Sequence, residues 1–368
     1  YAGNPQWAWF DPYTNQNDFP FDGGFSGHGT HVAGSVLGGA PGDAIGVAPG
    51  AQWIAAGSID RGGGISGTVA DAIETFEWLI DPDGNPDTVF DVPDIVTNSW
   101  GLLESFGYPL CDDLFWSFTD ALEFAGTIVI FAAGNEGASE IRRPADRATN
   151  PYRTFAVGAV DGNSSGFPVA GFSARGPSFC TFDGGPAIKP EIAAPGVSVR
   201  SAEAGSTGYS FKSGTSMATP HVAGVMAIVR GVNPDLTVPQ VKQIVFDTAL
   251  DLGPAGEDND SGHGMIDALA AAQAALETVG LTFGYPAGRP DLLAPAGGAT
   301  VTVSVASQQA TVVPGSGRLH WRVDGGPWQD VAMTELEPGL FEGTFPALPC
   351  GASVDWYASA EADSGETF

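Results

Sequence analysis

Residues 1–280 alternate short apolar runs with segments in which apolar residues recur at helical spacing. The apolar runs predict buried strands, because they are continuous rather than alternating; these are Gln52–Ile59, Asp94–Trp100, Thr127–Ala133 and Thr154–Val160. The helical spacing is found in Val69–Ile80, Leu114–Phe124, Val238–Leu250 and Ala268–Leu276. This repetition favours an α/β fold of three layers, a parallel sheet with helices on both faces and functional loops at the carboxyl ends of its strands.

After Gly280 the pattern changes to alternation with period two. The alternating segments predict half-buried strands; they are Thr300–Val305, Arg318–Val323, Leu340–Phe345 and Ser353–Ala360. Asp324-Gly325-Gly326 adds a hairpin turn. We predict a linker over residues 281–290 and a small all-β sandwich over 291–368, with its last strand cut off at Phe368. Surface attachment, substrate docking and spacing are all compatible with this module.

The composition of the chain limits the classes of partner that it can bind. Of its 368 residues, 43 are acidic and 14 basic, for a net charge of -29, so nucleic acid is excluded as a partner. The apolar fraction of 43% suffices for a sizeable core. We predict no membrane span, because no apolar run reaches the roughly 18 residues that one requires.

Two turns rich in small residues each carry a side chain suited to acyl transfer. His28 lies in SGHGTHVAG and Ser216 in SGTSMATPHVAG, each at the expected start of a helix. A serine hydroxyl needs a base to remove its proton, and imidazole titrates in the right range. Asn135, in FAAGNEG, follows an apolar strand and could donate its amide to an oxyanion.

Six segments of this chain resemble the subtilisin-like serine proteases, and most of all the bacillopeptidase F type of secreted bacterial enzyme. In chain order they are HGTHVAG (28–34), NSWG (98–101), AAGN (132–135), FAVGAVD (155–161), IKPEIAAPG (188–196) and GTSMATPHVAG (214–224). All six in the family's order make chance similarity a poor explanation. The resemblance implies a subtilisin-like protease domain over residues 1–280.

The resemblance also implies a role for each site residue. His28 would be the general acid and base, Ser216 the nucleophile and Asn135 the oxyanion donor. The residues that pair with the substrate backbone and form the wall of the main pocket would be Ser99, Trp100, Gly101, Ala132, Ala133 and Gly134. We therefore expect a secreted or cell-surface serine endopeptidase that acts as a monomer on polypeptide substrates.

One departure from the family concerns the triad aspartate. In subtilisin this residue precedes the histidine by about thirty positions, whereas only 27 residues precede His28. Asp11, Asp18 and Asp22 lie in this stretch, but none of them closes an evident apolar strand. We expect a polypeptide that starts at Tyr1 to be inactive for lack of this carboxylate. Asp22 could lie close to His28, although a polar loop residue is the simpler interpretation.

Two other functions fit the same residues. An α/β-hydrolase would use Ser216 with Asp260 and His263, in the chain order of that fold. An inactive subtilase-like protein would instead hold extended peptides by strand addition along Ser99–Gly101.

Cofactors and specificity are less constrained by the sequence. The chemistry requires no cofactor, and by resemblance structural calcium is the candidate metal; the alternating oxygens of Asp81–Asp87 are its best local candidate, beside the simpler interpretation of a solvated loop. The residues Arg142, Arg143, Asp146, Arg147 and Arg153 lie where the family builds its pocket floor, so an inward arginine would favour acidic substrate side chains. The alternative is that they face water.

The remaining cysteines and histidines have structural interpretations. Cys111 could pair with Cys180, leaving Cys350 single, or all three could be free thiols. His31 forms an HxxH pair with His28, for which helix packing is preferred over metal binding.

Overall fold

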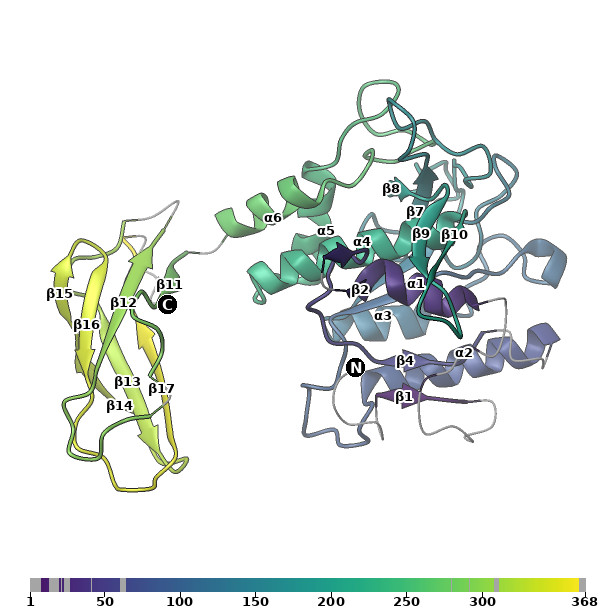
Figure 1. Ribbon diagram of the computed structural model, residues 1–368. Coiled ribbons are helices and arrows are strands. Elements are labelled where there is room, and N and C mark those ends of the chain that lie inside the picture. The colour runs from purple at the N-terminus through teal and green to yellow at the C-terminus, as the bar shows by residue number, and fades with distance from the viewer. Residues whose placement is uncertain are drawn as a thin grey trace. The chain divides into compact units, whose positions relative to one another are not determined.

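The computed structural model describes residues 8–12, 20, 22, 27–40, 42–59, 64–278, 280–290, 292–307 and 311–363. The chain divides into two compact units, Tyr1–Ala275 and Leu276–Phe368. In Figure 1 the first runs from purple to green and the second from green to yellow. No helix in the described part of the chain combines the length and the apolar composition of a membrane span.

The first unit is built on a parallel sheet of four strands in the order β5-β6-β7-β8. These strands are Ile95–Asn98, Ile128–Ala132, Phe155–Val160 and Ile192–Pro195. Every residue of β6 and β7 is buried, because helices cover both faces of the sheet. The predicted α/β architecture is therefore confirmed.

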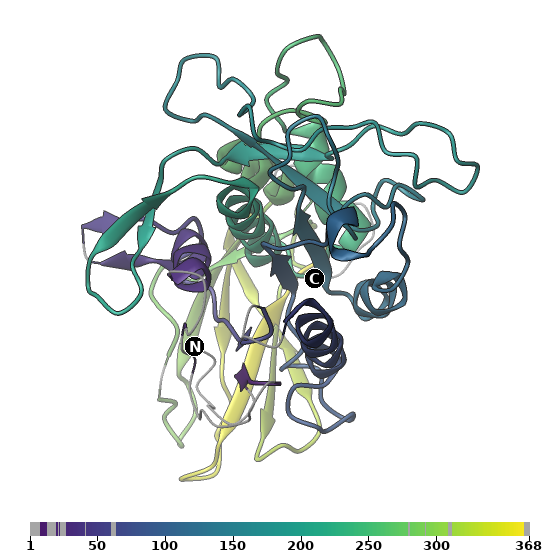
Figure 2. The same cartoon turned by 90° about the vertical axis from the view of Figure 1, so that its right-hand side faces the viewer.

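Two apolar clusters show that successive side chains of β6 point to opposite faces of the sheet. Ile128 and Ile130 pack with α4 (Thr215–Val232) and α5 (Val238–Asp247). Val129 and Phe131 pack with α2 (Gly64–Ile80) and α3 (Trp116–Phe124). In Figure 2, α2 and α3 lie to the right of the central helix α4, and α1 (His28–Leu37) lies to its left.

Smaller elements complete the first unit. They are β1 (Trp9–Phe10), β2 (Gly39–Ala40), β3 (Asp43–Ala44), β4 (Ala55–Ala56), the 3-10 turn η2 (Glu104–Phe106), β9 (Val199–Ala202), β10 (Tyr209–Lys212) and α6 (Ala268–Glu277). β1 pairs in parallel with β4, and β9 with β10 as a hairpin. The strand predicted over Gln52–Ile59 is thus reduced to two residues, and β8 was not predicted.

The second unit consists of two antiparallel sheets, in the orders β11-β12-β16-β15 and β14-β13-β17. Its strands are β11 (Thr282–Gly284), β12 (Thr300–Ala306), β13 (Arg318–Val323), β14 (Gln329–Ala332), β15 (Thr334–Glu337), β16 (Leu340–Thr344) and β17 (Val354–Ser359). Alternate residues of β12, such as Val301 and Val303, point into an apolar core between them. The segment predicted as a linker over 281–290 contains β11, which pairs with β12.

Candidate active site

Ser216 is the second residue of the central helix α4, directly after a turn that only glycine adopts readily. Gly214 has φ +154°, and its N–H donates to the carbonyl of Gly196 at 2.8 Å. The first N–H groups of a helix have no partner within it, so they favour negative charge beside Ser216. The helix start thus gives Ser216 an electropositive setting.

Ser216 and Ser99 hold each other by two reciprocal hydrogen bonds. The Ser216 hydroxyl donates to the Ser99 carbonyl at 3.1 Å, and the Ser99 hydroxyl donates to the Ser216 carbonyl at 2.8 Å. The second bond depends on Pro220, which lacks the N–H that would otherwise bond the carbonyl four residues earlier. Pro220 lies in the second turn of α4 and frees this carbonyl for Ser99.

Asn135 follows β6 and is held against the start of α4 by Thr215. Its Oδ1 accepts from the Thr215 N–H at 2.9 Å and from the Thr215 hydroxyl at 3.1 Å. With Oδ1 occupied, the Nδ2 group is the part of this exposed amide that can donate to a substrate oxygen. Sequence reasoning did not find the role of Thr215, since it depends on a contact between distant segments.

His28 opens α1, which packs against α4, so the helices of the predicted base and nucleophile are neighbours. Burial lowers the pKa of His28, the carboxylate of Asp22 raises it, and Lys212 and His31 lower it further. Across the described residues, the Ser216 hydroxyl bonds to Ser99 and no hydrogen bond joins it to the His28 ring.

Asp22 also fixes the start of α1, because its Oδ2 accepts from the Thr30 N–H at 2.8 Å. It is therefore more than a solvated loop residue. Asp11 is buried and does follow a strand, the two-residue β1, contrary to the expectation that no strand precedes it. Asp18 lies outside the described residues.

The predicted substrate-binding segments lie at the carboxyl ends of two neighbouring strands. Ser99–Gly101 follows β5, and Ala132–Gly134 closes β6. Trp100 packs edge-on against Phe131 at 5.5 Å between ring centroids and donates from Nε1 to Asn98 Oδ1 at 3.1 Å. These contacts fix Trp100 of the first segment against the strands that precede both segments.

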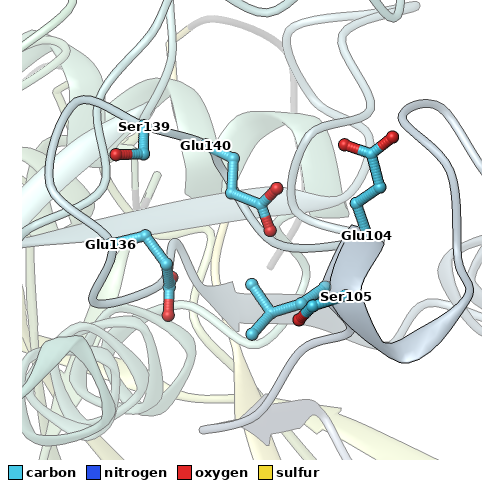
Figure 3. A pocket seen from close by; sticks show the side chains of 6 residues that line it. Glu104, Ser105, Glu136, Ser139 and Glu140 are labelled. Carbon is cyan, nitrogen blue, oxygen red and sulfur yellow. The ribbon is translucent and has the colours of Figure 1, made fainter.

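An acidic hollow of about 600 Å³ adjoins these segments. Figure 3 shows the carboxylates of Glu104, Glu136 and Glu140 around it, together with Ser105 and Ser139. Its lining residues begin two positions after Gly101 and two after Gly134. Glu136 and Glu140 are paired with Arg142 and Arg143, so across the described residues Glu104 is the carboxylate of this hollow without an ion-pair partner, and it favours a positively charged group there.

The arginines considered for the pocket floor are all paired with carboxylates. Arg142 binds Glu136 at 2.5 Å, and the buried Arg143 approaches Glu140 at 3.3 Å and Asp146 at 3.7 Å. Arg147 and Arg153 both bind Asp120, at 2.7 and 2.6 Å. Since their charges are matched, the hypothesis that an inward arginine favours acidic substrates finds no support.

The cysteine alternatives are resolved in favour of one pairing. Cys111 and Cys180 form a disulfide with a Cα–Cα distance of 5.1 Å, and Cys350 is a free, exposed thiol. Asp146 lies against this bridge, accepts from the Cys111 N–H at 2.9 Å and has its pKa raised to about 6 by burial. The bridge ties the loop before α3 to the segment after β7.

The other histidines have structural partners. His31 is fully buried, and its Nε2 lies 3.1 Å from the carbonyl of Val199 and 3.2 Å from that of Ser210, which joins α1 to the β9–β10 hairpin. His263 stacks on Phe246 at 4.2 Å, and Asp260 pairs with Arg175 at 3.4 Å. The α/β-hydrolase alternative, which needs Asp260 and His263 beside Ser216, therefore gains no support.

A parallel sheet flanked by helices, with serine, histidine and asparagine presented at helix starts and a strand end, defines the subtilisin-like class of fold and site. The solved structure of sphericase covers 72% of this chain, with 87% of its own chain matched, a TM-score of 0.55 and 29% identity. The model of the subtilase family, peptidase S8, matches residues 3–264. The chain belongs to the subtilase family.

Curated relatives agree with this assignment and confirm the resemblance found in the sequence. Bacillopeptidase F of Bacillus subtilis (strain 168) is 33% identical over 366 residues, which covers 92% of this chain and 24% of that protein. Serine protease AprX of the same strain is 34% identical and covers 64% of this chain and 55% of its own. Subtilisin Savinase of Lederbergia lenta is 34% identical over 251 residues, which covers 67% of this chain and 78% of that protein. The chain thus spans about a quarter of bacillopeptidase F and about half of AprX.

Proposed function

We propose that this chain carries the catalytic unit of an extracellular serine endopeptidase. The observation that supports it most is the arrangement around the start of α4. Thr215, the residue directly before Ser216, holds the side chain of Asn135 there by a hydrogen bond. The same helix packs against α1, which begins at His28. Relatives named as proteases share this family, and the Cys111–Cys180 disulfide is typical of an oxidising, extracellular compartment.

In the proposed reaction the Ser216 hydroxyl attacks the carbonyl carbon of the scissile peptide. The neutral imidazole of His28 takes the hydroxyl proton, and the negative charge that forms on the carbonyl oxygen is stabilised by Asn135 Nδ2 and the Ser216 N–H. The protonated His28 then donates to the leaving amine, which gives an acyl-enzyme on Ser216. Water activated by His28 hydrolyses this ester.

For this reaction the Ser216 hydroxyl must leave the Ser99 carbonyl and turn to His28. A serine side chain reorients by rotation about one bond, so the hydroxyl can leave the Ser99 carbonyl without movement of the α4 backbone. Substrate would extend along Ser99–Gly101 and Ala132–Gly134, with positively charged side chains directed to the acidic hollow around Glu104.

Active-site labelling tests the proposal. In the full-length protein, a fluorophosphonate should phosphonylate Ser216 in a 1:1 ratio, with the site identified by peptide mass spectrometry. Ser216→Ala should remove the label, while Ser206→Ala, an exposed serine of the β9–β10 turn, should keep it. Labelling that persists in Ser216→Ala would refute the assignment of the nucleophile. Saturable peptide binding with no label on a folded chain would favour the inactive, peptide-holding alternative.

A further inference from the structure

The loop between α2 and β5 brings three carboxylates together away from the candidate active site. Asp81, Asp83 and Asp91 each contribute one oxygen, and these oxygens lie within 4.8 Å of one another. Across the described residues, none of the three forms an ion pair with Lys, Arg or His. Three like charges at this separation repel one another unless a cation lies between them.

The buried member of the cluster has an oxygen without a partner. Asp91 is 4% exposed, and its Oδ2 accepts from the Asp83 N–H at 2.9 Å. Its Oδ1 is buried and accepts no hydrogen bond, and the same is true of Asp81 Oδ1. Buried carboxylate oxygens are nearly always hydrogen-bonded or bound to a metal, so two unsatisfied oxygens in one cluster indicate a missing ligand.

The loop holds these carboxylates in place by its own hydrogen bonds. Asp83 Oδ1 accepts from the Asn85 N–H at 2.9 Å, and the Thr88 hydroxyl donates to both oxygens of Asp83 at 3.1 and 3.2 Å. Trp78, near the end of α2, donates from Nε1 to the Pro82 carbonyl at 3.2 Å. The indole therefore lies beside the stretch that carries Asp81 and Asp83.

We propose that Asp81, Asp83 and Asp91 form a calcium-binding site. All three donors are hard carboxylate oxygens, which Ca²⁺ and Mg²⁺ accept and which Zn²⁺ rarely binds without nitrogen or sulfur. Ca²⁺ tolerates irregular geometry with six to eight oxygens, whereas Mg²⁺ demands a near-ideal octahedron. Asp81 and Asp83 are half-buried, which leaves room for water to complete the shell.

This site differs from the one that the sequence pattern indicated. The alternating oxygens of Asp81–Asp87 suggested Asn85 and Asp87 as further ligands, but both are exposed, and Asn85 Oδ1 accepts from the Asp87 N–H at 3.3 Å. Asp91 takes their place, because the chain folds back after Thr88. Calcium bound here would fasten the end of α2 to the segment that leads into β5, the strand that precedes Ser99.

Terbium luminescence provides a local test, since Tb³⁺ replaces Ca²⁺ and is excited by energy transfer from a nearby tryptophan. Titrating the purified chain with Tb³⁺ under excitation of tryptophan should give saturable green emission that Ca²⁺ displaces. D81N and D91N should each weaken this binding by at least about tenfold, because Ca²⁺ affinity follows the number of charged ligands. D87N, a change in the same loop outside the cluster, should bind within about twofold of the unmodified chain.

The variants separate a lost site from a lost fold. Far-ultraviolet circular dichroism and fluorophosphonate labelling of each variant report whether the first unit is intact, and D81N serves if the buried D91N does not fold. Equal Tb³⁺ affinity in the unmodified chain and in folded D81N would overturn the site. Displacement of Tb³⁺ by Mg²⁺ as effectively as by Ca²⁺ would overturn the assignment to calcium.

Discussion

The two units of this chain use charged residues in opposite ways. In the first unit, Lys242 of α5 is fully buried and binds Glu123 of α3 at 2.5 Å. In the second unit, Arg322 binds Asp355 at 2.8 Å across two strands, with side chains that are 38% and 53% exposed. A covered parallel sheet has room for a buried ion pair, whereas an antiparallel sheet with one solvated face keeps its pairs outside.

The same contrast applies to function. In the first unit, the ends of parallel strands and the starts of helices collect Ser99, Asn135, Ser216 and His28 into one region. In the second unit, polar residues alternate with more buried residues along β12, β13 and β17 and are spread over solvent-facing surfaces. A parallel α/β sheet therefore concentrates reactive groups at one edge, and an antiparallel sandwich disperses them.

The largest predicted effect tests the contrast between the ion pairs. Burial lowers the pKa of Lys242 and raises that of Glu123. Lys242→Met leaves the buried Glu123 with the partly exposed Arg153, 3.9 Å away, in place of its close cation, so we expect the first unit to lose about 3 kcal/mol of stability. Arg322→Met, the matched change in the second unit, should cost less than about 1 kcal/mol. Urea denaturation followed by circular dichroism measures both; equal costs would show that burial does not distinguish the pairs.

The next effect concerns the oxyanion donor. Asn135→Ala removes the amide that Thr215 orients, and a single lost donor of this kind costs about 10²–10³ in kcat. His320→Ala, which breaks a polar contact to Ser359 at 2.7 Å in the second unit, should leave turnover of a peptide substrate unchanged. A comparable loss in both variants would mean that the sandwich takes part in catalysis, and the division of function between the units would fail.

A smaller effect is expected in the acidic hollow. Glu104→Gln removes one exposed carboxylate, and such charges are worth at most about 1 kcal/mol. We compare two peptides that differ only in having Lys or Glu at one position. The kcat/KM of the Lys peptide divided by that of the Glu peptide should fall by about fivefold or less. Glu337→Gln, an exposed change in the second unit, should leave the ratio unaltered. A ratio that does not respond to Glu104→Gln would remove the hollow from the substrate path.

The main sheet was predictable where the apolar signal was continuous. β6 and β7 lie within the predicted runs, because strands buried on both faces need apolar residues at every position. β8 was missed because Ile-Ala-Ala-Pro is too short and too poor in β-branched residues to stand out. β11 was missed because the glycines and prolines around it are typical of a linker.

The candidate site was predictable in its residues and less so in its contacts. The motifs identified Ser216, His28 and Asn135, because each lies in a short pattern of small residues. The hydrogen bonds that hold them join distant segments, as between Ser99 and Ser216. Asp91 was overlooked for the same reason, since it reaches Asp81 only after the loop turns back. Local patterns therefore point to candidate residues, whose catalytic roles stay predictions, more readily than to the partners that orient them.

The smallest effect concerns the electrostatics of His28, whose pKa responds to two nearby charges in addition to burial. Asp22 raises the pKa of His28 and Lys212 lowers it. Asp22→Asn should lower this pKa further while keeping an oxygen that accepts from the Thr30 N–H, and Lys212→Met should raise it. Only neutral imidazole can take the serine proton. In a plot of the labelling rate against pH, the midpoint of the acid limb should therefore shift to lower pH in Asp22→Asn and to higher pH in Lys212→Met.

Opposite shifts are the decisive outcome of this last experiment, since a general disturbance of α1 would move both variants in the same direction. Arg318→Met, a change in an exposed ion pair of the second unit, serves as the control and should leave the limb in place. If neither Asp22→Asn nor Lys212→Met moves the limb, the titrating group is not His28. The charges of Asp22 and Lys212 would then have no consequence for the chemistry at Ser216.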